Sequence, residues 1–436
     1  MRCLRVVATA LLLCALLNGA AWAQQSVVPA GYPQQSQSPY SEVGSPSQLR
    51  AQYASTSNDY VAYSAEEEEE AEDTCRWCHG GKLGEPWALP QPNFFKEKGI
   101  NISGWVEAGV YTNAHGALSN GPLGFDNRTD FNMHQLALAI EKKTDTEKKC
   151  WDIGGRVDYL FGADGPDAQA FGDQSWDYGW NSSSQYGSAI PQMYVELAFG
   201  DWTIKGGRFW TAIGYEVVPA TGNFFFSHSY TCYYAEPFTH TGFQVTRKIN
   251  DKLSLFGGWV DGWDSGFDNR NSADNFLGGV NLTFSEKASL IWAVTAGNWG
   301  SGVIGNAGKI YMNSFVFNYK LTDKWTYVFQ HDLGSNTDNG TGDTMWYGVN
   351  QYLTYQINDC TAVGARLEWF RDNDGVRVVA GNAGNYYEAT LGVNVKPHSN
   401  LLIRPEIRWD WYEGTVTGEA PSTTASRTVS SPGAST

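Results

Sequence analysis

The chain has 436 residues and a formal net charge of −16, with 48 glycines, 18 tryptophans and 23 tyrosines. Its mean hydropathy of −0.38 shows that apolar residues are dispersed among polar ones. The acidic balance excludes a nucleic-acid-binding protein, which needs a basic face. No segment after residue 23 approaches the roughly 20 apolar residues of a membrane-spanning helix.

Residues 1–23 predict a secretory signal peptide, because two early arginines precede an apolar core that ends in Ala21-Trp22-Ala23. The next segment, 24–74, is rich in Gln, Ser and Pro and closes with a run of acidic residues. Such a composition cannot bury a core, so we expect a disordered arm. The acidic run is most simply a solvated stretch, and contact with calcium or the cell wall is the alternative.

A Cys-x-x-Cys-His motif, formed by Cys75, Cys78 and His79, lies in the segment 75–100. This spacing attaches c-type haem, but a haem also needs an apolar envelope, and the first expected strand already begins at residue 101. We therefore predict no cofactor and a periplasmic linker whose cysteines are oxidised together or joined to a partner. Haem c is the minor alternative, and a zinc site lacks an evident fourth ligand.

From residue 101 to residue 412, apolar and polar residues alternate with a period of two, which is the pattern of β-strands. Fifteen strands can be identified in this way. They span residues 101–112, 131–142, 151–162, 189–200, 202–210, 239–249, 251–261, 275–285, 288–298, 309–321, 324–333, 344–357, 360–371, 385–396 and 400–412.

The connections between these strands alternate in length. Every second one is a tight turn, such as Gly200-Asp201 or Asn358-Asp359, and the others are long and polar, such as 163–188 and 372–384. Outer-membrane barrels sort their connections in this way. The sequence therefore predicts an all-β fold, a transmembrane antiparallel up-and-down barrel with short periplasmic turns and long extracellular loops.

Fifteen strands would leave an open edge that lipid cannot satisfy, and single-chain barrels usually have an even number. We therefore expect sixteen strands. The polar tail 413–436 contains one candidate, a degenerate last strand within 414–429. Alternatively, the pattern splits or hides a strand elsewhere in the chain, or the C-terminus departs from that of a functional ancestor.

Charged residues share one face of several strands, opposite a face of aliphatic and aromatic residues. In a membrane barrel the charges belong in a wet lumen and the aromatics at the lipid. The alternative to a selective pore lining is a set of structural ion pairs that stiffen the wall. The residues predicted to line the pore are Glu107, Arg156, Asp158, Glu196, Arg366, Glu368, Arg404, Glu406, Arg408 and Asp410.

The connection 211–238 is long, aromatic and poor in charge, which is unusual for a solvated loop. We hypothesise that it folds into the lumen and narrows it, with Glu216, Asn223, His228 and Tyr230 at the constriction. The alternative is a loop packed on the extracellular rim.

Four stretches resemble the beta-barrel porin family described as OmpL-like: Gly104–Tyr111, Tyr194–Tyr230, Pro237–Val245 and Leu402–Trp411. The resemblance implies an outer-membrane barrel that acts as a pore. Members of the family normally finish with one more apolar strand that ends in an aromatic residue, which this chain does not show.

We predict an outer-membrane porin, not an enzyme, for passive diffusion of small hydrophilic solutes or ions. Its partners would be membrane lipid and these solutes, with a homo-oligomer as an option. The histidines are scattered, and neither a Ser/His/Asp spacing nor an HExxH motif occurs. The alternative function is a structural or adhesive envelope protein that does not conduct.

Overall fold

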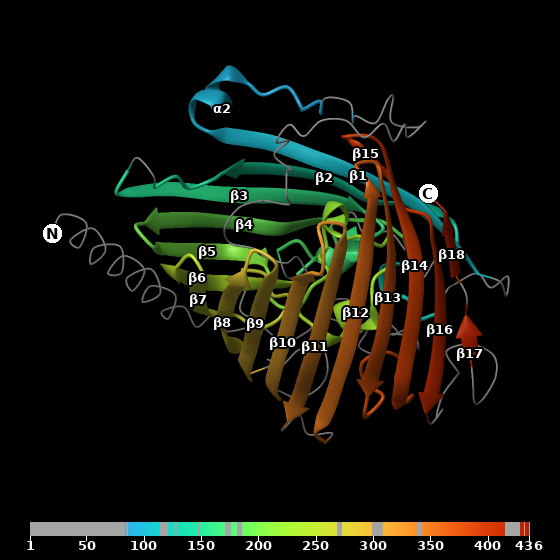
Figure 1. Cartoon of the computed structure of the whole chain (residues 1–436). Coiled ribbons are helices and arrows are strands. Elements are labelled where there is room, and N and C mark those ends of the chain that lie inside the picture. Colours follow the sequence, from blue (N-terminus) through green and yellow to red (C-terminus); the bar gives the residue numbers. More distant parts are fainter. Residues whose placement is uncertain are drawn as a thin grey trace, which may run out of the picture.

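The computed structural model describes residues 83, 86–113, 121–126, 129–146, 149–170, 176–180, 185–267, 273–298, 308–337, 342–414, 428–430 and 432–435. These residues form an antiparallel sheet in which each strand pairs with its neighbours along the chain (Figure 1). In this part of the chain, no helix is long and apolar enough to span a membrane.

The strands and helices take the labels of Figure 1. The strands of the first half are β1 (Ile100–Asn113), β2 (Phe131–Lys142), β3 (Trp151–Gly162), β4 (Gly187–Phe199), β5 (Trp202–Trp210), β6 (Thr239–Asn250), β7 (Leu253–Val260), β8 (Asp274–Ser285) and β9 (Ala288–Asn298). Those of the second half are β10 (Lys309–Lys320), β11 (Trp325–Thr337), β12 (Thr344–Asn358), β13 (Thr361–Asp372), β14 (Gly384–His398), β15 (Leu401–Ile403), β16 (Glu406–Gly414), β17 (Thr428–Ser430) and β18 (Pro432–Ser435). The helical pieces are α2 (Asn93–Glu97), η1 (Gly124–Asp126), α3 (Gly165–Ala168), η2 (Ala220–Gly222) and the π-helical turn η3 (Thr231–Ala235).

The barrel has sixteen strands when two interrupted ones are each counted once. β15 and β16 form one strand that is broken at Pro405, because proline has no N–H to donate to the ladder. β17 and β18 form the other. β18 pairs with β16 at Glu406 and Ile407 and with β1 from Val110 to Asn113, so the last strand joins the first. The prediction of a sixteen-stranded up-and-down barrel is confirmed. The C-terminal tail contributes its last strand, which lies at 428–430 and 432–435 and therefore mostly beyond the predicted range 414–429.

The fifteen predicted strands agree closely with the structure. Four have the predicted bounds, namely β2, β3, β5 and β9. The largest extension is in β11, which continues past the predicted end at Leu333 to Thr337 because Gly334 to Asn336 pair with both β10 and β12. That stretch has the composition of a loop, so cross-strand pairing overrides its weak local preference for a strand.

The two faces of the sheet differ as the alternation predicts. Outward-facing Val195, Leu367 and Ile407 are 62%, 54% and 53% exposed, whereas Arg366 and Glu368, on either side of Leu367, are buried inside. A wide exposed apolar surface is unfavourable in water but suits a protein whose outer face contacts lipid.

The segment before β1 lies against the end of the barrel that carries the short turns. The backbone N–H and C=O of Trp87 bond the side chain of Asn400 in the turn between β14 and β15, at 2.9 Å each. α2 and β15 accordingly lie at the same end, at the top of Figure 1. The N-terminal segment is therefore on the side that the sequence predicts to be periplasmic.

An arginine at Leu367 tests whether this face contacts lipid. Leu367 is central in β13, so Leu367→Arg should lower the free energy of unfolding in lipid vesicles by about 2–4 kcal/mol. The matched control is Leu401→Arg, an equally exposed leucine at a strand end, which should cost about 0–1 kcal/mol. Denaturant titration followed by tryptophan fluorescence measures both, and equal small costs would contradict a lipid-facing surface.

Candidate functional site

The connection between β5 and β6, residues 211–238, folds into the interior of the barrel, and we call it the lumen loop. Most of its residues are buried, and in Figure 1 it runs behind β10–β13. Its hydrogen bonds reach side chains of β2, β11, β12, β13 and β16. The loop therefore crosses the lumen from the β5–β6 edge to the opposite wall, as the sequence hypothesis requires.

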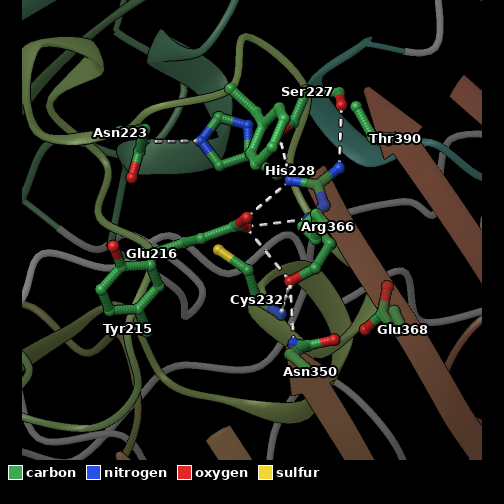
Figure 2. A network of polar contacts seen from close by, with 12 residues as sticks. Tyr215, Glu216, Asn223, Ser227, His228, Cys232, Asn350, Arg366, Glu368 and Thr390 are labelled. Carbon is green, nitrogen blue, oxygen red and sulfur yellow. Dashed lines mark hydrogen bonds and ion pairs between the residues drawn. The ribbon is translucent and has the colours of Figure 1, made fainter. Parts of the chain in front are cut away.

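Arg366, on β13, is at the centre of the contact between wall and loop (Figure 2). Its guanidinium bonds Glu216 of the loop at 2.6 Å and Glu388 of β14 at 2.9 Å. It also donates to the carbonyl oxygen and the hydroxyl of Ser227, at 2.6 and 2.8 Å. Because the Arg366 side chain is fully buried, these acceptors replace the water that its charge has lost.

Two wall carboxylates hold the backbone of the loop. Glu368 accepts hydrogen bonds from the N–H groups of Tyr230 and Thr231, both at 2.6 Å. Glu406 accepts from the N–H groups of Phe226 and Ser227, at 2.8 and 3.1 Å. These charge-assisted bonds satisfy backbone donors that a loop withdrawn from water would otherwise leave unpaired.

Two wall arginines bind the carbonyl groups of the same segment. Arg404 donates to Ala220, Asn223 and Phe225, at 2.9, 3.1 and 3.1 Å. Arg408 donates to the carbonyl of His228 at 2.6 Å and pairs with Asp410 at 2.7 Å. The wall thus provides carboxylates for N–H groups of the loop backbone and guanidinium groups for its carbonyl groups.

Three consecutive phenylalanines of the loop pack against glycines of the wall. A Cβ atom added at Gly364 of β13 would lie 2.4 Å from the Phe224 ring, and one at Gly392 of β14 would lie 3.0 Å from the Phe225 ring. At Gly109 of β1 the corresponding distance to the Phe226 ring is 2.3 Å. The glycines leave the space that these rings occupy, so the loop fits the wall by shape as well as by charge.

Among the four residues predicted at the constriction, the two outermost in sequence bind the wall directly. Glu216 pairs with Arg366, and Tyr230 bonds Glu368 through its N–H and packs its ring 5.2 Å from the Arg408 guanidinium.

The side chains of the other two act within the loop, while their carbonyl groups accept from Arg404 and Arg408. The Asn223 amide bonds the N–H of Val217 at 2.8 Å and lies 3.3 Å from Nε2 of His228. The loop meets open space instead at its half-buried or exposed residues, Tyr215, Pro219 and 221–224.

The charge on Glu216 is stabilised by its surroundings. Burial alone raises the pKa of this carboxyl, but the Arg366 guanidinium, His228 and the Ser229 N–H together outweigh burial, so the pKa of Glu216 is lowered below 4.5. Glu216 is therefore ionised at neutral pH, which the ion pair with Arg366 requires.

The ten residues predicted to line the pore divide into two groups. Seven of them surround the lumen loop or its anchors: Glu107, Arg366, Glu368, Arg404, Glu406, Arg408 and Asp410. The other three lie on β3 and β4, where Arg156 pairs with Asp158 at 2.7 Å and Glu196 accepts from Thr144 at 2.8 Å. All lie on the inward face. Glu107 is the one partly exposed residue of the first group. In the second group, Arg156 and Glu196 are partly exposed and Asp158 is buried.

Several anchoring residues were not identified from the sequence. Gln135 of β2 donates to the Val218 carbonyl at 2.7 Å, Gln330 of β11 to Glu236 at 2.7 Å, and Trp346 of β12 to the Ala235 carbonyl at 3.0 Å. Glu388, which shares Arg366 with Glu216, was also missed. Alternation places all four on the inward face, but the two neutral amides and the indole do not stand out as charges do, and Glu388 is the only carboxylate of its strand.

The Cys-x-x-Cys-His residues Cys75, Cys78 and His79 lie outside the described residues, so their state stays a prediction. Cys360, at the turn before β13, is disulfide-bonded. In the part of the chain that the structure describes, no group of three or more His, Cys, Asp or Glu residues is arranged to hold a metal ion.

Several solved outer-membrane proteins are similar in structure to this chain. The outer-membrane channel DcaP of Acinetobacter baumannii has 12% identity and a TM-score of 0.51, with 80% of this chain and 99% of that chain covered. An anion-selective porin from Comamonas acidovorans has 11% identity and a TM-score of 0.55, with 77% and 97% covered. A loop-deletion mutant of OmpT, an outer-membrane protein of Vibrio cholerae, has 12% identity and a TM-score of 0.50, with 77% and 97% covered.

These structural likenesses support the barrel fold. No curated protein sequence matches the chain significantly. The sequence profile of the family described as "Putative beta-barrel porin-2, OmpL-like" matches residues 99–433. The chain therefore belongs to this OmpL-like beta-barrel porin family and is a porin of the outer membrane.

Proposed function

We propose that the lumen loop is the fixed constriction of this porin and that small hydrophilic solutes or ions diffuse past its exposed edge. The observation that carries the proposal is the fully buried Arg366, which joins Glu216 of the loop to Glu388 of the wall. A loop packed on the extracellular rim would not contribute a carboxylate to a charge network inside the barrel.

The loop is fixed because moving it would break the charge-assisted contacts that are buried between the loop and the wall. Arg366 would lose one of its two carboxylates, and Glu368 and Glu406 would lose their backbone donors. Breaking a buried pair by removing one partner typically costs about 3–5 kcal/mol. A loop held by several such contacts does not open on thermal fluctuation alone.

The more accessible charges of the lumen are expected to set its selectivity. The arginines that bind the loop are neutralised by carboxylates and carbonyl groups, so their field in the passage is small. Partly exposed charged side chains of the inner wall include Glu141 of β2, Arg156 of β3 and Glu196 of β4. We infer that a permeating ion senses these residues more than it senses Arg366 or Arg408.

The proposal needs neither a cofactor nor a catalytic step, because diffusion through a water-filled channel requires only an open path. Each chain carries its own channel, so the proposal holds equally for a single barrel and for a homo-oligomer. Single-channel recording separates it from the alternative of a structural envelope protein: discrete conductance steps support a pore, and silence from correctly folded protein supports the structural role.

Deletion of residues 223–234 tests the constriction. The deletion removes the part of the loop that reaches the far wall, so single-channel conductance in a planar bilayer should rise. The control deletion removes 301–306 from the connection between β9 and β10 and should leave conductance near the wild-type value. Unchanged conductance in the first variant would rule out the constriction.

A second variant narrows the passage without disturbing the anchors. Thr221 is exposed on the loop edge, so Thr221→Trp should lower conductance while the barrel folds normally. The matched control is Thr337→Trp, at the loop-side end of β11, which should have little effect on conductance.

Acidification tests the ion pair between Glu216 and Arg366. Because the folded-state pKa of Glu216 lies below 4.5, its stabilising contribution is complete above that pH and is lost as the pH falls through the lower folded-state value. The contribution of this ion pair to a quiet open-channel current should therefore be lost below pH 4.5, where current noise should increase. Glu216→Gln should show the increased noise already at pH 7.

The control for acidification is Glu196→Gln, which changes a carboxylate that bonds Thr144 away from the loop. This variant should keep the wild-type dependence of noise on pH. A Glu216→Gln channel as quiet as the wild type would contradict the role of this ion pair.

A further inference from the structure

The junction between the last and the first strand has an unusual construction. We call this junction, where β17 and β18 lie between β16 and β1, the seam. Within the described residues, β18 pairs with β1 along Val110–Asn113, whereas β2 pairs with β1 along Ile100–Val110. β17 and β18 are only three and four residues long. A weakly paired edge is costly in a bilayer, where no water can satisfy open backbone groups.

Side chains cross the seam on the lumen side. Tyr111 of β1 donates its hydroxyl to Glu406 of β16 at 2.9 Å, and Arg404, just before β16, forms an ion pair with Glu107 of β1. Tyr111 and Glu406 both pair with Ala434, from opposite sides of β18. The hydrogen bond between their side chains therefore passes over the last strand and joins its two neighbours.

One residue of the lumen loop, Phe226, contacts both sides of the seam by itself. Its ring stacks on Tyr111 of β1, with centroids 5.1 Å apart, and meets His134 of β2 edge-on at 5.0 Å. Its N–H bonds Glu406 of β16 at 2.8 Å.

Ala220 repeats this arrangement. Its N–H donates to Gln135 of β2 at 3.0 Å, and its carbonyl accepts from Arg404 at 2.9 Å. Two residues of the loop thus each bind the β1–β2 side and the β15–β16 side at the same time.

We propose that the lumen loop has a second function as an internal clasp that holds the barrel closed at the seam. The described part of the last strand is short, and the clasp supplies buried contacts between the strands on either side. This function depends on the position of the loop and not on conduction. It accounts for the side-chain and backbone contacts that join the strands on either side of the seam.

Other loop anchors provide a matched control, because they bind the wall on one side of the seam only. Glu368 and Glu406 are both buried, both accept two loop N–H groups and both accept one hydroxyl, from Thr231 and Tyr111 respectively. Glu368 is on β13, which β14 and β16 separate from the seam. Glu406 is at the seam itself.

Hydrogen exchange of the folded full-length protein in detergent micelles tests the clasp. Glu406→Gln should speed exchange of amides in Val110–Asn113 and Glu406–Gly414 at least about tenfold, the effect of weakening one charge-assisted hydrogen bond. Glu368→Gln should speed exchange around Tyr230 and Thr231 and leave the seam amides at the wild-type rate.

A second pair of variants keeps the backbone anchors intact. Phe226→Ala removes the ring on Tyr111 and should speed exchange at the seam, whereas Phe224→Ala removes the ring over Gly364 of β13 and should not. Equal exchange at the seam in both members of either pair would overturn the clasp. If conductance changed in all four variants without a change at the seam, the constriction would stand and the clasp alone would fail.

Discussion

A charge or a backbone N–H that is withdrawn from water must find its partner within the protein, and the structure depends on this constraint. At the lipid face the constraint is met by strand pairing around the barrel. Inside, it is met between the wall and the lumen loop. Arg366 shares its charge between Glu216 and Glu388, while Glu368 and Glu406 take up backbone donors of the loop. Moving the loop out of the lumen would therefore leave charged groups of the wall, as well as backbone N–H groups of the loop, without these partners.

Most of the fold could be predicted from the sequence because the pattern that encodes it is local. Alternation of Arg404, Glu406, Arg408 and Asp410 with Ile407 and Trp409 is visible in the printed sequence, and the structure places the two sets on opposite faces. The last strand could not be located in this way. β17 and β18 are only three and four residues long, too short for an alternating pattern to be recognised, and they are identified by their pairing with β16 and β1.

The candidate site was predicted in part. The aromatic, charge-poor composition of residues 211–238 identified the loop, because such a segment is unsuited to a solvated position. The alternation of charged residues showed which side chains point inward, but not what covers them. Arg366 would point inward whether the lumen held water or a folded loop. The long-range contacts of the structure show that Ser227 and Glu216 cover it. The sequence likewise does not show that wall glycines leave the space in which the Phe224–Phe226 rings pack, because this depends on three-dimensional contacts.

An engineered disulfide between loop and wall tests the central claim most directly. A Cβ atom at Gly348 of β12 would lie 3.5 Å from Cβ of Thr231 in the loop, within the range that disulfides bridge. In a Cys232→Ser background, Thr231→Cys with Gly348→Cys should oxidise in folded barrels to a species whose gel mobility reverts on reduction. Thr231→Cys with Val349→Cys, whose second cysteine faces outward, should stay reduced. Folded barrels in which the first pair also stays reduced would contradict a loop docked on the lumen wall.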